Sequence, residues 1–189
     1  VKTDGRHAEV IFTKDWKEDS IRRDFTINSI YADIDGNIFD PNNGVEDLQN
    51  GTVRFIGNSY ERIQEDYLRI LRYIRFFLLY SKKDHSNDIK KTIKQNISGV
   101  ANLSKERLLD ELNKIFKSRA LFKLVKDTFS YEIISLIFPQ LINLKILKKL
   151  EKKKEEILIN KSFDFLLALL ILDETDNADY FLYKFNLSN

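Results

Sequence analysis

The order of apolar and polar positions along the chain changes near residue 58. Before that point, apolar and polar residues alternate over residues 7–13 and 25–34, which predicts two strands. An Asp-Gly pair at residues 35–36 lies between apolar segments and favours a hairpin turn. A third short strand is expected over residues 52–57, after a loop rich in glycine, asparagine and aspartate.

Beyond residue 58, apolar side chains recur every three or four positions, which predicts helices. Ser59 is expected to cap a helix that ends near residue 80, and a polar loop over residues 82–88 follows it. A further helix is expected over residues 88–97.

Ser104 is expected to begin the next helix, with Leu103 and Leu108 packed against each other across its first turn. Helical segments are expected over most of residues 119–189, with a break at Pro139. The whole pattern predicts an α+β chain in which a strand-containing part precedes an all-helical part.

The composition restricts the classes of protein that fit. The 189 residues have a formal net charge of only +2, so any nucleic-acid contact has to come from local basic patches. No cysteine is present, which excludes disulfides and cysteine zinc sites and fits a reducing, cytoplasmic setting. The longest apolar run, residues 165–172, is far shorter than the roughly 20 residues of a membrane span. Since methionine is also absent, we expect a piece of a longer protein.

The helix expected over residues 59–80 has a strongly charged face. At about 100° per residue, one arc of its surface holds Arg62, Glu65, Asp66, Arg69 and Arg72, with Arg75 at the edge. A separate arc forms the expected core face, which consists of Ile63, Tyr67, Ile70, Leu71, Ile74, Phe77 and Leu78. An ordinary amphipathic helix with salt bridges between residues four apart also explains this pattern.

Asp66 and Arg69, about one helical turn apart, offer complementary hydrogen bonding. An ionised aspartate only accepts hydrogen bonds, and an arginine only donates them. Cytosine and adenine present an amino donor beside a ring-nitrogen acceptor, whereas guanine and uracil present a carbonyl and an N–H. Such a pair therefore favours C and A, because the wrong base leaves buried groups unpaired. Arg72 and Arg75, further along, are candidates for holding a triphosphate.

Several ordered segments carry a family resemblance. The main ones are RRDFTINS at 22–29, DPNNGVEDL at 40–48 and EDYLRILRYIRF at 65–76. In this order they resemble the class II tRNA nucleotidyltransferases, a family that comprises the CCA-adding enzymes and related bacterial poly(A) polymerases. The opening TDGRHAEVIFTKDW agrees, and LSKERLLDELNKIF is similar to the family's neck motif. The resemblance covers roughly residues 1–120.

The resemblance implies a domain organisation. Residues 1–58 correspond to the C-terminal strands of a nucleotidyltransferase head, and residues 59–118 to a helical neck that recognises the base. Residues 119–189 correspond to part of a helical body, where the resemblance rests on helical character alone.

Site residues in the head are implied as well. Arg23, Asp24 and Asn28 are expected to face the ribose and phosphates of a nucleotide. A flexible hinge between head and neck is implied for three further residues, Asp40, Gly44 and Asp47. This element would let one pocket change shape between addition of C and addition of A.

In the neck, the resemblance implies that Asp66 and Arg69 recognise the base and that Arg72 and Arg75 lie near the phosphates. The neck motif also contains three residues for which a structural role is expected, Glu106, Arg107 and Glu111.

Catalysis in this family needs two divalent metal ions, and the family's metal-binding aspartates precede the region present here. No catalytic or metal-binding residue is therefore predicted in this chain, and Mg²⁺ is expected to be bound mainly by upstream residues. Glu9 is a candidate for a further carboxylate, although it also fits an ordinary polar strand position. His7 and His85 are expected to be structural or surface residues, and Asp33 and Asp35 to be turn residues.

The implied function is addition of CCA to tRNA 3′ ends from CTP and ATP, with this chain inactive by itself. A poly(A) polymerase or an enzyme that adds part of CCA is the alternative within the family. A non-catalytic nucleotide- or RNA-binding module is the alternative from another class. Lysines of the body, Lys148, Lys149 and Lys152–Lys154, either follow the tRNA backbone or form a solvated helix face.

Overall fold

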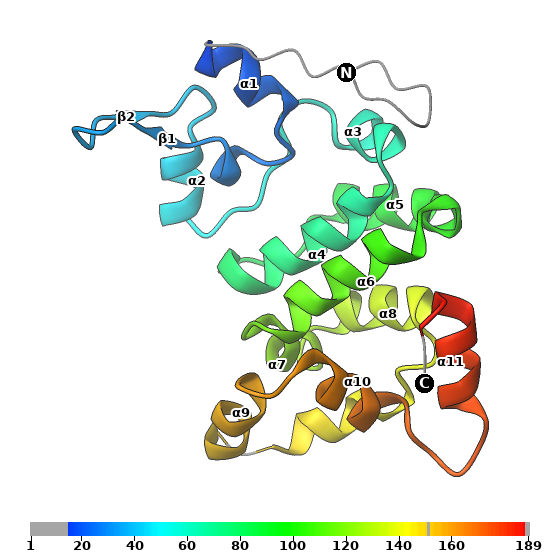
Figure 1. The fold of residues 1–189 in the computed structure, drawn as a ribbon. Coiled ribbons are helices and arrows are strands. Elements are labelled where there is room, and N and C mark those ends of the chain that lie inside the picture. The colour runs from blue at the N-terminus through cyan, green and yellow to red at the C-terminus, as the bar shows by residue number, and fades with distance from the viewer. Residues whose placement is uncertain (1–14, 151, 188–189) are drawn as a thin grey trace. The chain divides into compact units, whose positions relative to one another are not determined.

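The computed structural model describes residues 15–150 and 152–187 and is shown in Figure 1. Contacts divide the chain into two compact units, Val1–Gly57 and Asn58–Asn189, and each is described by itself. The strand expected over residues 7–13 lies outside the described residues. The division into head, neck and body stays a prediction.

The first unit combines short helices with a small antiparallel sheet. In chain order its described elements are α1 (Trp16–Arg22), the 3₁₀ helix η1 (Thr26–Asn28), β1 (Tyr31–Ala32), β2 (Ile38–Phe39) and α2 (Gly44–Gln49). The α+β class is thereby confirmed, with fewer strand residues than the sequence pattern suggests.

The strand expected over residues 25–34 is wrong for most of its length. The side-chain oxygen of Asn28 accepts a hydrogen bond from the Phe25 amide at 3.1 Å, and the Ser29 hydroxyl donates to the Thr26 carbonyl at 2.9 Å. These local hydrogen bonds satisfy backbone groups within a 3₁₀ turn, in place of hydrogen bonds to a neighbouring strand. The third expected strand is reduced to one bridge, in which Phe55 pairs with Phe25.

The hairpin is confirmed. Tyr31 lies opposite Phe39 in β1 and β2, and Gly36 in the connection has a φ of +83°, which glycine adopts without strain. The Asp33 carboxylate accepts hydrogen bonds from the Asn37 side chain and backbone, both at 2.8 Å. These bonds lower the pKa of Asp33. Asp33 and Asp35 are therefore turn residues, as expected.

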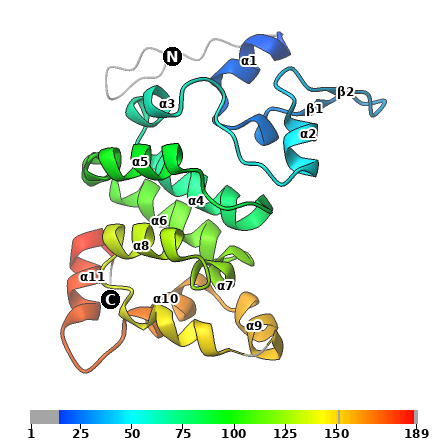
Figure 2. The ribbon, with the colours of Figure 1, turned by 180° about the vertical axis from the view of Figure 1, so that it is seen from behind.

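The second unit is helical in the part that the structure describes (Figures 1 and 2). Its elements are α3 (Ser59–Glu65), α4 (Leu68–Tyr80), α5 (Asn87–Asn96), η2 (Ile97–Asn102), α6 (Lys105–Phe116), α7 (Ala120–Leu124), α8 (Thr128–Ile137), η3 (Ile142–Lys149), α9 (Lys152–Ile159), α10 (Phe163–Ile171) and α11 (Asn177–Phe185). Among the described helices, none has both the length and the apolar character needed to cross a membrane.

The single helix expected over residues 59–80 is wrong, because the chain leaves the helix at Asp66. This residue has an extended backbone (φ −155°, ψ 104°), and its carboxylate accepts a hydrogen bond from the Leu68 amide at 3.1 Å. An aspartate in this position ends one helix and caps the next. The N-cap of α3 is Asn58 rather than Ser59, since the Asn58 side chain accepts from the following amides.

The apolar face of α4 forms the centre of the helical unit and packs against α6 and α7. The expected core residues Ile63, Ile70, Leu71, Ile74, Phe77 and Leu78 are buried. Tyr67 is only partly buried, and its ring lies against Gly99, where an added Cβ would come within 2.3 Å of the ring. A glycine at 99 therefore allows the close approach of η2 to this tyrosine.

Local helix signals later in the chain are confirmed at several points. The Ser104 hydroxyl accepts from the Arg107 amide at 3.4 Å at the start of α6, and α8 ends before Pro139. In the lysine-rich segment, however, residues 142–149 form a 3₁₀ helix. Here Leu141, Leu144 and Leu147 are buried, a spacing of three that matches three residues per 3₁₀ turn.

His85 has a structural role, as expected, while His7 lies outside the described residues. The imidazole is buried and is 3.0 Å from both the Tyr73 hydroxyl and the Asp127 carboxylate. Its ring stacks on Phe77 with a centroid distance of 3.4 Å. Burial alone would raise the pKa of Asp127, but hydrogen bonds from His85 and the first turn of α8 lower it to about 2.

This network predicts a pH-dependent contribution to stability. Asp127 has a folded pKa of about 2 against an ordinary value of 3.8, so its charge stabilises the fold above pH 4 and this stabilisation is lost as the pH falls toward 2. We expect Asp127→Asn to lower the free energy of unfolding by about 1 kcal/mol at pH 6, allowing for partial solvent exposure. This loss of unfolding free energy should disappear near pH 2, where Asp127 becomes protonated.

Urea unfolding at several pH values measures this difference. The control is Asp88→Asn, at an exposed aspartate in the first turn of α5, which should show little dependence on pH. A constant difference between the Asp127 variant and the parent sequence from pH 6 to pH 2 would contradict the assignment.

Candidate nucleotide site

The residues expected to face a nucleotide fall on both units. Arg23, Asp24 and Asn28 belong to the first unit, and the charged face that begins at Arg62 belongs to the second. The geometry of each group is described within its own unit.

In the first unit, Arg23 follows α1 and its side chain is half-exposed. The guanidinium donates to the Asp19 carboxylate at 2.9 and 3.0 Å and lies 5.9 Å from the centre of the Tyr31 ring. The Tyr31 hydroxyl also donates to Asp19, and the two donors lower the pKa of this carboxyl. Asp24 is buried, and the side-chain oxygen of Asn28 is used by the η1 turn. Of the two charged residues, Arg23 is therefore the accessible one.

The expected hinge is held by side-chain hydrogen bonds within the first unit. Asp40 accepts from the amides of Gly44 and Val45 at 2.7 and 2.9 Å. Asp47 accepts from the Thr26 hydroxyl at 2.5 Å and from Arg54 at 2.9 Å. A Cβ at Gly44 would lie 2.1 Å from the backbone oxygen of Thr26, so only glycine permits this approach. The hinge role stays a prediction, and any movement has to break these contacts.

In the second unit, the break between α3 and α4 places Asp66 at the start of α4. One oxygen of its carboxylate accepts from the Leu68 amide, and the other accepts from the Arg107 guanidinium of α6 at 2.6 Å. The side chain of Asp66 is 29% exposed, so it is partly desolvated and still reachable.

Arg69 lies in the first turn of α4 and has a side chain that is 11% exposed. One of its terminal nitrogens donates to the Glu65 carboxylate at 2.6 Å and to the Arg62 carbonyl at 2.5 Å. Arg62 donates to the same Glu65 oxygen at 2.5 Å. Hydrogen bonds from Arg69 and the charges of both arginines lower the pKa of Glu65. The end of α3 therefore orients the guanidinium of Arg69.

Arg75, expected near the phosphates, donates to the carboxylate of Glu111 on α6. The Glu111 side chain is 1% exposed and the Arg75 side chain 15%, and Lys114 lies 3.5 Å from the second Glu111 oxygen. Arg72 is partly buried on the same helix. Phosphate roles for Arg72 and Arg75 stay predictions.

The residues of the neck motif have defined partners that the sequence did not identify. Arg107 and Glu111 lie one turn apart on α6; Arg107 engages Asp66, in the break before α4, and Glu111 engages Arg75 of α4. The spacing gave no signal for this pairing, because Arg107 and Glu111 are four residues apart whereas Asp66 and Arg75 are nine apart. The structural role expected for Arg107 and Glu111 agrees with these contacts.

The described residues do not fit a magnesium site. Over residues 15–150 and 152–187, no group of three or more histidine, aspartate or glutamate side chains is arranged to hold a metal ion. Glu9, the one candidate carboxylate, lies outside the described residues. The charged side chains described above instead provide hydrogen-bonding groups and positive charge, which suit a nucleotide.

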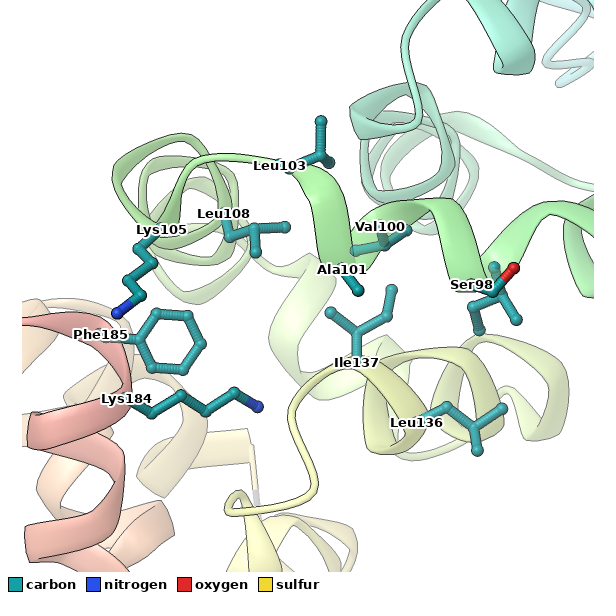
Figure 3. Close-up of a pocket in the computed structure, with 11 residues that line it drawn as sticks. Ser98, Val100, Ala101, Leu103, Lys105, Leu108, Leu136, Ile137, Lys184 and Phe185 are labelled. Carbon is teal, nitrogen blue, oxygen red and sulfur yellow. The ribbon is translucent and has the colours of Figure 1, made fainter.

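A separate pocket of about 480 Å³ lies among η2, α6, α8 and α11 (Figure 3). Its walls are mainly apolar, and Figure 3 shows Lys105 and Lys184 on either side of the Phe185 ring. Burial lowers the pKa of Lys184, and the Lys105 ammonium donates to the Asn186 side chain at 3.1 Å. None of the expected nucleotide residues lines this pocket.

Comparison with known proteins decides the family. A model described as the poly(A) polymerase head domain matches residues 1–54, and one described as a probable RNA- and SrmB-binding site of polymerase A matches residues 86–145. The human protein named CCA tRNA nucleotidyltransferase 1, mitochondrial, is 53% identical over 117 residues, which are 61% of this chain. The chain belongs to the tRNA nucleotidyltransferase and poly(A) polymerase family.

Other members of the family match over more of the chain. The CCA-adding enzyme of Staphylococcus haemolyticus is 34% identical over 92% of it. The crystal structure of the Bacillus stearothermophilus CCA-adding enzyme in complex with CTP covers 94% of the chain and 45% of its own, with a TM-score of 0.63 and 28% identity. The chain spans 27% of the length of the human relative and 41% of the staphylococcal one.

The buried pair between α4 and α6 predicts a large loss of stability on truncation. We expect Glu111→Ala to lower the free energy of unfolding by roughly 3–5 kcal/mol, because it leaves the Arg75 charge without its buried partner. The matched control is Asp110→Ala at the preceding, exposed aspartate of α6, which pairs with Lys114 at the surface and should cost less than about 1 kcal/mol. Denaturant unfolding compares the two variants, and equal losses would contradict the importance of the buried pair.

Proposed function

We propose that the protein to which this chain belongs adds CCA to the 3′ ends of tRNA, with CTP and ATP as substrates. Family membership supports the reaction class, and the names of the human and staphylococcal relatives specify CCA addition. The position of Asp66 is the observation that supports assigning nucleotide recognition to particular residues of this chain. Its carboxylate is partly buried, fixed at both oxygens and followed one turn later by Arg69.

Base selection is assigned to this pair. Each carboxylate oxygen of Asp66 has two lone pairs, and its described bonds come from the Leu68 amide and from Arg107. The amino group of cytosine or adenine therefore has an acceptor without displacing either partner. Arg69, oriented by Glu65, donates to the adjacent ring nitrogen. Guanine and uracil would place a carbonyl against the carboxylate, which leaves both unpaired.

Arg23, Asp24 and Asn28 are assigned to the ribose and phosphates, and Arg72 and Arg75 to the phosphates. Asp40, Gly44 and Asp47 are assigned to the hinge. These assignments rest on the family motifs rather than on an observed contact with a nucleotide.

The proposed reaction uses Mg²⁺, with ligands expected outside the described residues. When bound, the metal ions of such a site assist attack by the 3′-hydroxyl and neutralise the departing pyrophosphate. A cytoplasmic location remains a prediction, and the human relative is named as a mitochondrial protein.

A poly(A) polymerase is the second candidate, since the model that matches residues 1–54 is described as a poly(A) polymerase head domain. The two activities differ in product rather than in the residues present here. Sequencing the 3′ ends made by the full-length protein from a mixture of CTP and ATP separates them, because CCA addition stops after three nucleotides and poly(A) synthesis continues.

Nucleotide binding by this chain tests the assignment of Asp66 and Arg69. We expect CTP and ATP to bind about tenfold or more tightly than GTP and UTP, because the wrong base leaves partly buried hydrogen-bonding groups unpaired. Asp66→Ala and Arg69→Ala should each abolish this preference. Isothermal titration with the four nucleotides measures it.

Two exposed residues of the same unit supply matched controls. Asp110→Ala and Arg119→Ala remove the same types of charge away from the start of α4 and should leave the nucleotide preference unchanged. Equal binding of all four nucleotides by the unmodified chain would overturn base selection by this unit alone. Retained preference in both Asp66→Ala and Arg69→Ala would overturn the residue assignment.

A further inference from the structure

The pocket of Figure 3 has no part in the nucleotide site, and we call it the apolar pocket. Its volume of about 480 Å³ falls within the range of roughly 300–1,000 Å³ that is usual for small-molecule pockets. It is formed entirely within the helical unit. Its apolar walls come mainly from η2, α6, α8 and α11 and include Val100, Leu103, Leu108, Leu136, Ile137 and Phe185.

Two lysines give the apolar pocket a charged end. Lys105 is the first residue of α6 and Lys184 lies in the last turn of α11, and Figure 3 shows their side chains on either side of the Phe185 ring. Ile137 of α8 lies toward the opposite end in that view. Among the described lining residues, the only other polar side chain is that of Ser98, which is exposed. The pocket therefore combines an apolar interior with a positively charged end.

Neither lysine has a carboxylate partner among the described residues. The Lys105 ammonium donates to the neutral Asn186 side chain at 3.1 Å, and the Lys184 ammonium lies 5.4 Å from the centre of the Phe185 ring. Burial lowers the pKa of Lys184, because its charged form is partly desolvated. An anion placed beside both ammonium groups would neutralise their charge and replace the lost hydration.

The start of α6 adds to the positive potential at this end. The amide groups in the first turn of a helix carry partial positive charge, so an anion is favourable there and a lysine is not. Lys105 occupies the first position of α6, and Glu106 beside it is exposed and does not line the pocket. The charged end therefore suits an anionic group better than a neutral one.

The apolar walls restrict the rest of the ligand. Leu136 is 60% exposed at the pocket, and an apolar body would remove its surface from water, which is favourable. Walls with few hydrogen-bonding side chains would leave the polar groups of a sugar or a base unpaired. A carboxylate, by contrast, has two oxygens that accept hydrogen bonds and can serve both ammonium groups. A hydrocarbon body with one carboxylate therefore matches both parts of the pocket.

We propose that the apolar pocket binds a small carboxylate with a hydrocarbon body, of the chemical class of the fatty acids. Lys105 and Lys184 pair with the carboxylate, and the walls from η2 and α8 surround the hydrocarbon. Charge complementarity at one end distinguishes this ligand from a neutral hydrocarbon, and the apolar remainder distinguishes it from RNA. The site is additional to the proposed CCA addition and does not depend on it.

Isothermal titration of the full-length protein with octanoate and with octanamide tests this inference. The two probes have hydrocarbon chains of equal length and differ in the charge of the head group. We expect octanoate to bind about tenfold more tightly, because only its carboxylate forms charge-assisted hydrogen bonds with the lysines. Lys105→Met/Lys184→Met should remove this preference while it keeps the aliphatic stems that pack in the pocket. The control is Lys91→Met/Lys117→Met, which removes two exposed lysines outside the pocket, has the same net charge and should keep the preference.

A further variant tests the pocket independently of its charge. Ala101→Trp places a large side chain at an exposed position of the η2 wall and should abolish octanoate binding by filling the space. Because this change leaves both lysines in place, retained binding would contradict the location of the site. Circular dichroism verifies that each variant is folded.

The outcomes separate this ligand from other occupants. A preference for octanoate that is lost in the Lys105→Met/Lys184→Met variant and kept in the control supports the proposal. Absence of octanoate binding, equal affinity for the two probes, or an unchanged preference in that variant overturns it. Displacement of octanoate by tRNA would identify an RNA contact and also overturn it. The preference for CTP and ATP, measured on the same variants, should be unchanged, so failure of base selection is distinguished from failure of the apolar pocket.

Discussion

The buried ion pair between Arg75 and Glu111 is the interaction on which the helical unit depends most. A carboxylate that is 1% exposed requires a charged partner, and Arg75 supplies it from the neighbouring helix. Together with the bond from Arg107 to Asp66, it attaches α4 and the break before it to two residues of α6 that lie one turn apart. Because both bonds are directional, they fix the rotation of α4 about its axis, and with it the direction in which its charged face points.

The break between α3 and α4 at Asp66 connects these contacts with α6 to the proposed recognition of a nucleotide base. One carboxylate caps α4 through the Leu68 amide, accepts from Arg107 and retains lone pairs for a base. Glu65, the last residue of α3, pairs with Arg69 of α4 across this break. A continuous helix would have given Asp66 no capping role, and its carboxylate would have been less constrained. Here the residue that ends a helix is also the residue proposed to select the nucleotide.

Polar and charged groups elsewhere in the helical unit lie in two different environments. Around His85, polar groups from α4, the following loop and α8 are buried and satisfy one another, which ties these segments together. Between the α7–α8 connection and η3, by contrast, one hollow is lined by four exposed lysines, Lys126, Lys145, Lys148 and Lys149, and only Lys126 has a salt-bridge partner among the described carboxylates. The first arrangement stabilises the fold, whereas the lysine charges of the second repel one another.

The sequence by itself determined the features that arise within a few residues of chain. The cap at Ser104, the end of α8 before Pro139 and the hairpin around Gly36 all follow from local hydrogen bonding or fixed backbone angles, and the ordered motifs identified the family. Only the tertiary structure decided the break at Asp66, the 3₁₀ form of η3 and the partners of the charged residues. Those depend on contacts between segments far apart in the chain, such as Arg107 of α6 with Asp66, whose geometry no spacing along the sequence specifies.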